Sequence, residues 1–419
     1  MRFFANIRWS IKQHVRRKKR YLVKYFRKLL TRRHFSPKND GVSYKRALPV
    51  PNRSFFLFGP RGSGKSTWIR ENIKSILYLD LLNQDLYTDL LVRPGLLGDL
   101  AAGLPTGSWV VIDEVQKNPA LLNEVHRLIE EKKLKFVLSG SSARQLKKSG
   151  TNLLAGRASQ RFLFPFVPEE LGDDFNLEQA LRYGTLPIVW AAEDKKDVLQ
   201  SYSQIYLKEE IQAEALVRNL QGFVRFLPIA AVCHGQSLNT SSIARDAGVA
   251  RTTVNGYLDI MEDTLMAFRI PAYEAKLRVK ERKHPKFYLV DAGIVRALRR
   301  KFDVPDSEEK GALFEGFVAT CLRAVNAYYE VFDEIFYWAS TESNVEVDFI
   351  LKRGSEFWAI EVKSAKRFHP TMTSSLSALA GWKGLTRRIL VYGGSHRLKL
   401  PEKIEAMSVT DFFKVVSHE

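Results

Sequence analysis

The first chemically informative pattern is a glycine-rich loop followed by a lysine and two hydroxyl residues. An apolar run at residues 55–58 leads directly into the loop, and a helical pattern starts at Trp68. The segment fits G-x4-G-K-[ST], in which backbone N–H groups surround phosphate oxygens at the amino end of a helix. The residues predicted to bind a nucleotide are Gly59, Pro60, Arg61, Gly62, Ser63, Gly64, Lys65, Ser66 and Thr67.

Side chains near this loop have distinct predicted roles in ATP hydrolysis. We expect Lys65 to reach the β- and γ-phosphates and the Ser66 hydroxyl to ligate Mg²⁺. A buried strand further along the chain ends in Asp113 and Glu114. Asp113 suits the Mg²⁺ shell, and Glu114 suits polarising the attacking water. Another strand ends at Ser139, which we expect to touch the γ-phosphate or that water.

A second group of chemically competent residues lies in the last part of the chain. Glu315 is on a predicted helix, Asp348 is on a predicted strand, and Glu361 and Lys363 are on the next strand. Strand alternation places Glu361 and Lys363 on one face, beside Asp348. Asp348 and Glu361 would bind Mg²⁺, and Lys363 would orient or deprotonate a water. Glu315 could complete the metal shell from the helix.

Residues 241–258 have the spacing of two helices packed across a tight turn, the helix-turn-helix arrangement. The second helix would expose side chains able to read a nucleic-acid groove, namely Arg251, Thr252, Thr253 and Asn255. Acidic residues follow closely, so a lid or a protein-binding role remains open beside DNA contact.

The positive charge of the chain is concentrated at its start. Residues 1–48 hold 16 of the 65 Lys and Arg residues and one of the 46 acidic residues. Apolar residues recur there at helical spacing, which predicts a basic amphipathic helix. Three interpretations remain open: a solvated extension, a contact with nucleic acid or polyphosphate, and a contact with an anionic membrane or partner.

Composition sets limits on the remaining possibilities. At 419 residues the chain predicts two or three domains, and 45% hydrophobic residues exclude a mainly disordered protein. The longest apolar runs are too short for a membrane-spanning helix. The two cysteines, Cys233 and Cys321, lack metal-ligand spacing, so we expect no disulfide framework and a cytoplasmic location.

Residues 44–190 resemble a AAA-type P-loop ATPase of a large prokaryotic family. The resemblance rests on the motifs at residues 56–61, 113–116, 139–142 and 154–157. It implies that Arg157 is an arginine acting on a γ-phosphate in the same chain or in a neighbouring one. Arg144 and Arg161 are alternatives for this role.

The C-terminal part resembles the restriction-endonuclease-like fold of the PD-(D/E)xK type, with Asp348, Glu361 and Lys363 matching the motif. Val347 stands where that motif usually has proline. The same part also resembles the domain of unknown function that accompanies the ATPase family. This resemblance implies a nucleic-acid-acting module, either active or catalytically inert.

The predicted fold class is α/β, with a AAA-type P-loop NTPase domain, a helical and winged-helix-like middle and a restriction-endonuclease-like C-terminal domain. The predicted limits are 1–43 for the arm, followed by 44–193, 194–302 and 303–419. The predicted function is an ATPase, with ATP and Mg²⁺ as cofactors, coupled to a Mg²⁺-dependent nuclease module in genome maintenance or defence. The alternative is a regulatory ATPase switch, with an inert nuclease-like domain, that acts on protein or membrane partners. DNA is the expected partner of the arm and the middle region; a homo-oligomer and a membrane surface are further candidates.

Overall fold

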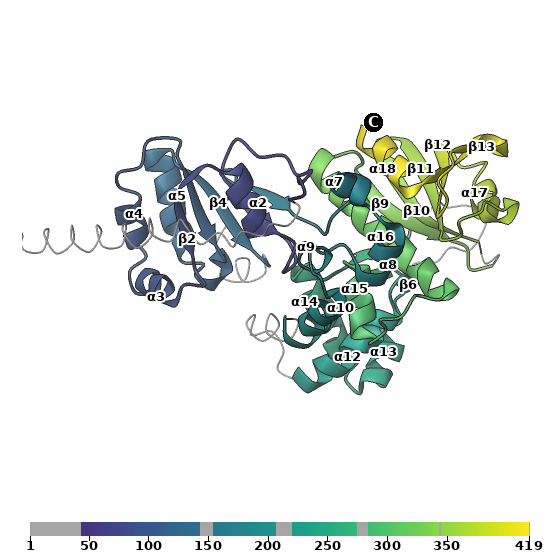
Figure 1. Ribbon diagram of the computed structural model, residues 1–419, viewed down its shortest axis with the longest axis horizontal. Helices are drawn as coiled ribbons and strands as arrows, with labels where there is room; N and C mark the ends of the chain where they lie inside the picture. Colours follow the sequence, from purple (N-terminus) through teal and green to yellow (C-terminus); the bar gives the residue numbers. More distant parts are fainter. Residues whose placement is uncertain (1–42, 143–153, 207–219, 275–283, 343–344, 419) are drawn as a thin grey trace, which may run out of the picture.

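The computed structural model describes residues 43–142, 154–206, 220–274, 284–342 and 345–418. The predicted basic arm therefore lies almost wholly outside the described residues, as does Arg144. The described chain forms a P-loop unit (β1 to β5), a middle unit (α7 to α15) and a C-terminal unit (α16 to α18). Figure 1 shows the P-loop unit at the left, the C-terminal unit at the upper right and the middle unit below it. Among the described residues, no helix combines the length and the apolar character needed to cross a membrane.

The P-loop unit is built on a five-stranded parallel sheet with the order β2-β3-β4-β1-β5. The predicted strands before the glycine-rich loop, before Glu114 and at Ser139 are all present, and two further strands lie at the edges of the sheet. The strands are β1 (Phe55–Phe58), β2 (Ser75–Asp80), β3 (Trp109–Asp113), β4 (Lys135–Gly140) and β5 (Ser159–Phe162). The inner strands are apolar on both faces because helices cover both sides.

Alternation along β1 divides the core of this unit in two. Phe55 and Leu57 face the core that continues into the rest of the molecule, whereas Phe56 and Phe58 face a separate core. One helix packs on the shared side and three pack on the separate side. They are α2 (Lys65–Asn72) on the shared side, and α3 (Gln84–Val92), α4 (Leu96–Leu100) and α5 (Leu121–Lys132) on the other.

The middle unit is helical, with a small sheet of order β6-β8-β7. The predicted helix-turn-helix is present: two helices meet at Gly248, whose φ of +63° is in the left-handed region that favours glycine. The elements are α7 (Pro168–Leu171), α8 (Leu177–Tyr183), α9 (Pro187–Trp190), α10 (Lys195–Ser201), α12 (Leu220–Val232), β6 (Gln236–Ser237), α13 (Thr240–Ala247), α14 (Arg251–Asp263), β7 (Ala267–Ile270), β8 (Lys286–Leu289) and α15 (Ala292–Leu298).

The C-terminal unit is a six-stranded mixed sheet of order β13-β14-β12-β11-β10-β9. A long helix opens it, and two strands and a helix follow β12 at the end of the chain. The elements are α16 (Ser307–Tyr329), β9 (Glu334–Ala339), β10 (Glu346–Arg353), β11 (Glu356–Lys363), α17 (Ser374–Ala378), β12 (Leu385–Tyr392), β13 (Leu398–Leu400), β14 (Ile404–Ser408) and α18 (Val409–His418). The sheet is mixed, and its assignment to the restriction-endonuclease-like fold stays a prediction.

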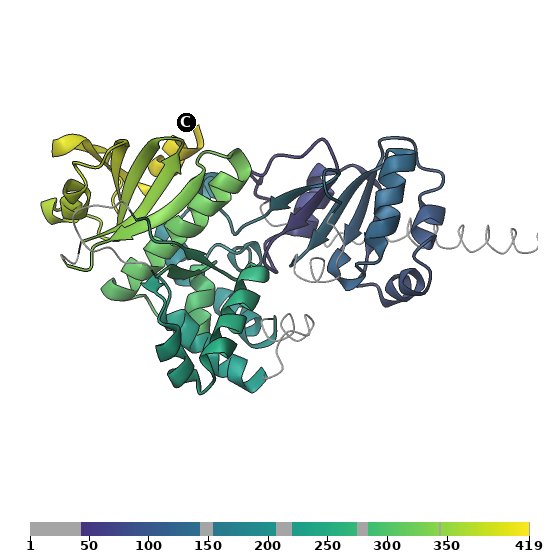
Figure 2. The ribbon, with the colours of Figure 1, turned by 180° about the vertical axis from the view of Figure 1, so that it is seen from behind.

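The three units are joined by a continuous apolar core and by direct hydrogen bonds. Buried residues from β1, α14, α16 and α18 belong to one cluster. The backbone N–H of Tyr337 on β9 donates to Pro271 O at 3.0 Å, and the N–H of Tyr273 donates back to Tyr337 O at 2.7 Å. The view from behind shows the C-terminal sheet above the middle helices (Figure 2). The middle and C-terminal units therefore share a strand-like connection.

Candidate functional site

The phosphate-binding loop, residues 59–67, links β1 to α2, as the motif requires. Gly62 and Gly64 have φ values of +79° and +85°, a conformation that side-chain-bearing residues rarely adopt. A Cβ on Gly59 would lie 2.3 Å from the Leu163 carbonyl oxygen, so only glycine fits there. The backbone geometry of the loop therefore requires glycine at these positions of the motif.

Lys65 is the first residue of α2 and is 7% exposed. Its Nζ donates to Gly59 O at 2.8 Å and to Pro60 O at 3.2 Å. The ammonium therefore lies under the loop at the amino end of a helix, where the helix dipole and free N–H groups also attract phosphate.

Asp113 is the point at which the loop and three strands meet. Its Oδ2 accepts hydrogen bonds from Ser66 Oγ at 2.8 Å and from Tyr78 OH at 2.6 Å. Its Oδ1 accepts from Ser139 Oγ and, at 3.2 Å, from Glu114 N. Because these donors come from α2, β2 and β4, the carboxylate orientation is fixed from several sides.

Ser139 is fully buried, and its hydroxyl is directed at Asp113. Its predicted contact with the γ-phosphate or water stays a prediction, and the observed contact orients Asp113. Tyr78 was missed by sequence reasoning. The feature that could have identified Tyr78 is its position on β2, which pairs with β3 so that Tyr78 lies opposite Val111.

Glu114 has a φ of +58°, which places a non-glycine residue in the left-handed region. Gln116 Nε2 donates to its Oε2 at 2.5 Å. Burial raises the pKa of the Glu114 carboxyl, and nearby Lys65 partly opposes that rise. The carboxylate next to Asp113 is thus held in a defined position beside the loop.

Arg157 lies away from the phosphate-binding loop of its own chain. β5 runs parallel to β1 with Ser159 opposite Phe55, so Arg157 precedes β5 at the amino edge of the sheet. The loop follows β1 at the opposite, carboxyl edge. Arg157 is exposed and pairs with Glu130, Nε to Oε1, at 2.5 Å. This geometry does not support action within the chain, and action on a neighbouring chain stays a prediction.

Three side chains outside the motif enclose the loop. Arg46 Nη1 donates to Ser63 O at 2.7 Å, and Tyr202 OH donates to Arg61 O at 3.0 Å. A Cβ on Gly62 would meet the side chain of Ile188 at 2.6 Å. Since these residues are distant in sequence, no local pattern could have identified them.

The helix-turn-helix exposes three of its four predicted contact residues, Arg251, Thr252 and Asn255, while Thr253 is half-buried. Arg251 Nε also donates to Thr240 Oγ1 at 3.1 Å. The acidic residues that follow are partly neutralised, since Arg269 on β7 pairs with Asp259 at 3.1 Å and with Glu262. The charge of this surface is therefore less acidic than the sequence suggests.

The structure brings the C-terminal candidates together. The β10–β11 register pairs Phe349 with Ile360, which places Asp348 beside Glu361. Val362 N donates to Asp348 Oδ2 at 2.8 Å, and Lys363 Nζ contacts Glu361 Oε1. Burial, together with neighbouring Asp348, raises the pKa of Glu361. Its Oε2 is buried and accepts no hydrogen bond from any described residue.

A lysine that the sequence reasoning missed is part of this site. Lys286 on β8 has its Nζ 2.7 Å from Glu315 Oε1, 2.5 Å from Glu346 Oε1 and 3.6 Å from Asp348 Oδ1. Tyr288 OH also donates to Glu315 Oε1 at 2.6 Å. The feature that could have identified Lys286 is its charge at the start of an otherwise apolar strand.

We call Glu315, Glu346, Asp348 and Glu361 the acid cluster. Its carboxylate oxygens are the donors that Mg²⁺ and Mn²⁺ prefer, so its chemistry fits a divalent cation. In the arrangement observed, however, the described residues include no group of three or more His, Cys, Asp or Glu side chains positioned to hold a metal ion.

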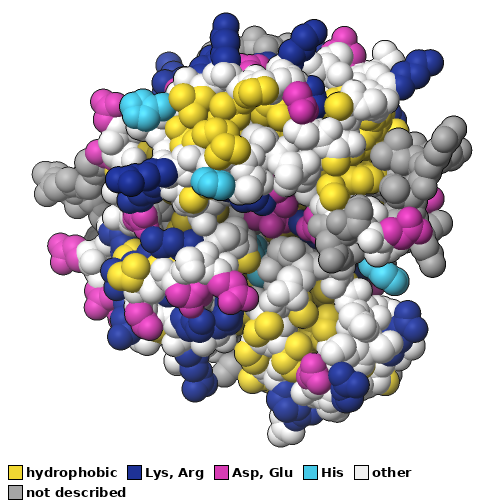
Figure 3. Space-filling model, turned by 90° about the vertical axis from the view of Figure 1, so that its right-hand side faces the viewer, with side chains coloured by type: hydrophobic (Ala, Val, Ile, Leu, Met, Phe, Trp, Pro, Cys, Tyr) yellow, Lys and Arg dark blue, Asp and Glu magenta, His cyan; other side chains and the backbone are white. Residues whose placement is uncertain are grey.

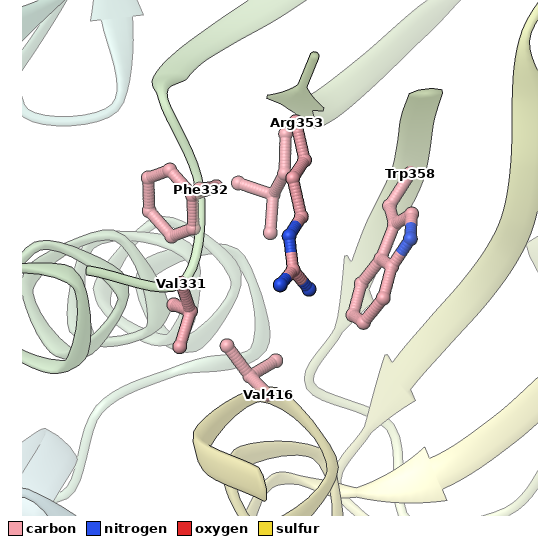
Figure 4. A pocket seen from close by; sticks show the side chains of 6 residues that line it. Val331, Phe332, Arg353, Trp358 and Val416 are labelled. Atoms are coloured by element: carbon pink, nitrogen blue, oxygen red, sulfur yellow. The ribbon is translucent and has the colours of Figure 1, made fainter. Parts of the chain in front are cut away.

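A separate, small pocket lies nearer the β10–β11 turn. The residues lining it are mostly apolar: Val331, Phe332, Leu351, Arg353, Trp358 and Val416. Figure 4 shows the Arg353 guanidinium between Phe332 and Trp358. The residues predicted as sites lie elsewhere.

Three protein families match successive parts of the chain. An AAA domain matches residues 51–172, the domain of unknown function DUF8612 matches residues 174–304, and the domain of unknown function DUF4143 matches residues 310–412. The chain is therefore an AAA-domain protein with two further domains, and its AAA domain implies nucleotide binding.

The chain is also homologous to mycobacterial proteins. It is 27% identical over 363 residues to the uncharacterized protein Rv2008c of Mycobacterium tuberculosis, covering 84% of this chain and 79% of that one. The uncharacterized protein Mb2031c of Mycobacterium bovis matches equally.

Similarity to solved structures is weak. The Aeropyrum pernix ORC1 protein in complex with DNA is 11% identical, covers 60% of this chain and 87% of its own, and has a TM-score of 0.29. A point mutant of the Thermotoga maritima RuvB protein is 17% identical, covers 52% and 82%, and also scores 0.29.

Proposed function

We propose that this protein binds and hydrolyses ATP at residues 59–67 and that its nucleotide cycle controls a nucleic-acid-acting, metal-dependent C-terminal module. The observation that carries the ATPase part is the position of Asp113. It accepts hydrogen bonds from the loop hydroxyl of Ser66 and from neighbouring strands, with Glu114 directly beside it.

Each residue has a specific task in hydrolysis. Lys65 and the loop N–H groups hold the phosphates, and Glu114 accepts the proton of the attacking water. Ser66 and Asp113 would hold Mg²⁺, which would neutralise charge on the transferred phosphoryl group. Ser139 and Tyr78 keep Asp113 oriented for this purpose.

A chain of buried contacts supports communication between the loop and the C-terminal unit. Arg46 donates to the loop at Ser63 O and pairs with Glu170 at 2.9 Å, with its side chain 5% exposed. Tyr328 of α16 interacts with Arg46 and accepts a hydrogen bond from Phe164 N at 3.2 Å. Because α16 also carries Glu315, a shift of the loop has a direct structural route to the acid cluster.

The nuclease assignment is supported by Asp348, Glu361 and Lys363, which lie side by side on β10 and β11. DNA or another polyanion is the proposed partner of the basic N-terminal region and of the exposed face of helix α14. Arg157, exposed at the sheet edge away from its own loop, would act in a homo-oligomer.

One observation favours a second candidate function. Lys286 lies among the carboxylates where a cofactor cation would bind, which suits a regulatory ATPase with an inert C-terminal module acting on protein or membrane partners.

The two candidates are separated by an assay of ATP turnover and of Mg²⁺- or Mn²⁺-dependent cleavage with single- and double-stranded DNA and RNA. The proposal predicts turnover stimulated by a polynucleotide, with cleavage abolished by Asp348→Asn while turnover persists. Turnover that is indifferent to every polynucleotide, without cleavage, would favour the regulatory switch.

A further inference from the structure

Lys286 connects the middle unit to the C-terminal unit, which are separate segments of the sequence. It is the first residue of β8 in the middle unit, and the acidic residues around it belong to α16 and β10 of the C-terminal unit. Its side chain is 2% exposed, whereas that of Glu346 is 30% exposed. The ammonium is therefore buried at the junction, with solvent reaching the cluster from the Glu346 side.

An ammonium buried in this way is stable only with close anionic partners. Its three N–H donors face three carboxyl groups, at 2.7 Å from Glu315, 2.5 Å from Glu346 and 3.6 Å from Asp348. Lys286 is thus a fixed internal cation.

We propose that Lys286 is an autoinhibitory latch: its ammonium takes the place of a divalent cation in the acid cluster and keeps the metal site closed. This inference rests on the proposed function of the C-terminal module. Mg²⁺ needs oxygen ligands, such as carboxylates and waters, at about 2.0–2.1 Å in near-octahedral geometry. Oxygens of Glu315 and Glu346 that contact the ammonium cannot surround a second cation in the same place.

The remainder of the cluster has capacity for a cation. Asp348 Oδ2 accepts one backbone hydrogen bond, and Glu361 Oε2 is buried without a hydrogen bond from any described residue. Four carboxyl groups share the region with two lysines, Lys286 and Lys363. Removing the Lys286 ammonium would enlarge this excess of carboxyl groups, which a divalent cation would then balance.

The latch is held by contacts at the junction of the two units. The Tyr337 hydroxyl on β9 donates to His284 O, two residues before Lys286, and the Tyr337 ring lies 5.4 Å from the Lys286 ammonium. The space-filling view shows acidic side chains in a hollow between the upper, C-terminal part and the lower, middle part (Figure 3). Movement of the start of β8 away from β9 would withdraw the ammonium and open the cluster.

The test measures Mn²⁺ binding to the full-length, nucleotide-free chain by titration calorimetry. Lys286→Met keeps the length of the side chain and removes the charge. We expect Mn²⁺ to bind Lys286→Met about tenfold or more tightly than wild type, because it no longer competes with a buried ammonium. Adding Asp348→Asn should abolish the gain, which assigns it to the acid cluster.

Two further variants serve as a control and as a second test of the latch. Lys352→Met removes a lysine from an exposed ion pair on the same sheet, with Glu334 at 2.7 Å, and should leave Mn²⁺ binding unchanged. Lys286→Met with Glu346→Gln removes one carboxylate together with the ammonium. It therefore tests the latch even if the excess charge of the single variant prevents folding.

The outcomes distinguish the latch from the proposed nuclease. Equal Mn²⁺ affinity in wild type and Lys286→Met would overturn the latch and leave the nuclease assignment standing. A gain in Mn²⁺ binding without cleavage of any nucleic acid would support the latch and contradict the nuclease. No Mn²⁺ binding by either folded Lys286 variant would overturn both.

Discussion

The Ser66 hydroxyl donates a hydrogen bond of 2.8 Å to Asp113 Oδ2, which joins the phosphate-binding loop directly to the end of β3. Tyr78 donates to the same oxygen from β2, at 2.6 Å. The position of the Asp113 carboxylate therefore depends on a residue outside the loop motif.

Replacing Tyr78 by phenylalanine tests this dependence. The change removes one donor to a buried carboxylate, so we expect a loss of about 1–3 kcal/mol in the free energy of unfolding. Turnover should fall about five- to tenfold, corresponding to roughly 1 kcal/mol of weaker transition-state stabilisation. Nucleotide affinity measured without Mg²⁺ should not change. Tyr87→Phe on α3 is the matched control, and an equal loss of turnover in both variants would contradict the role of Tyr78.

Lys65→Ala should weaken ATP binding about tenfold to a hundredfold, because it removes a charged hydrogen-bond donor from the phosphate cradle. Equilibrium binding of a fluorescent ATP analogue measures the effect. Lys74→Ala, an exposed lysine just after α2, is the control for a general loss of positive charge. Unchanged affinity in folded Lys65→Ala would mean that the loop does not bind the phosphates.

The strands and the loop were predictable because their signals are local. An apolar run that ends in a glycine-rich loop predicts a buried parallel strand, and Phe55–Phe58 is fully buried. The adjacency of Asp348 and Glu361 was predictable for the same reason, since a short turn fixes the pairing of two neighbouring strands.

The contacts between units were not predictable from local pattern. Lys286 meets Glu315 because β8 packs beside α16, and Arg46 reaches Ser63 because the loop is enclosed by the rest of the fold. Arg157 is the opposite case. Its motif implied a place near the phosphate, but strand order puts it at the other edge of the sheet in its own chain.

His234 predicts a specific pH dependence of stability. Burial, and to a lesser degree Arg299, lowers its pKa from 6.5 to about 3, so the folded chain keeps this ring neutral. Below pH 6.5 the unfolded chain binds a proton that the folded chain does not, so stability is lost as pH falls from about 6.5 towards 3. Between pH 6.5 and 5 the loss should be about 1–2 kcal/mol.

His234→Asn should flatten this pH dependence in denaturant unfolding, since the amide oxygen can still accept the hydrogen bond that Leu289 N gives Nδ1 at 3.0 Å. His126→Asn on α5 removes an exposed histidine and should leave the profile as in wild type. A profile that keeps its full slope in His234→Asn would place the titrating group elsewhere.

Deleting residues 1–40 tests the basic N-terminal region, which lies outside the described residues. If this region binds a polyanion, each phosphate that it neutralises makes the slope of log K for binding against log salt concentration steeper by about 0.9. The deletion should remove that contribution. ATP turnover without nucleic acid should remain almost unchanged. An identical salt dependence with and without these residues would indicate that the region is a solvated extension that does not bind the polyanion.

The central claim is that Glu114 activates water for ATP hydrolysis beside Asp113. The most direct measurement is the single-turnover rate of ATP hydrolysis by Glu114→Gln, whose amide oxygen can still accept the hydrogen bond from Gln116. We predict wild-type ATP affinity and a rate at least about a hundredfold lower, because the amide cannot accept the proton of the water. Hydrolysis by Glu114→Gln at the wild-type rate would contradict the account.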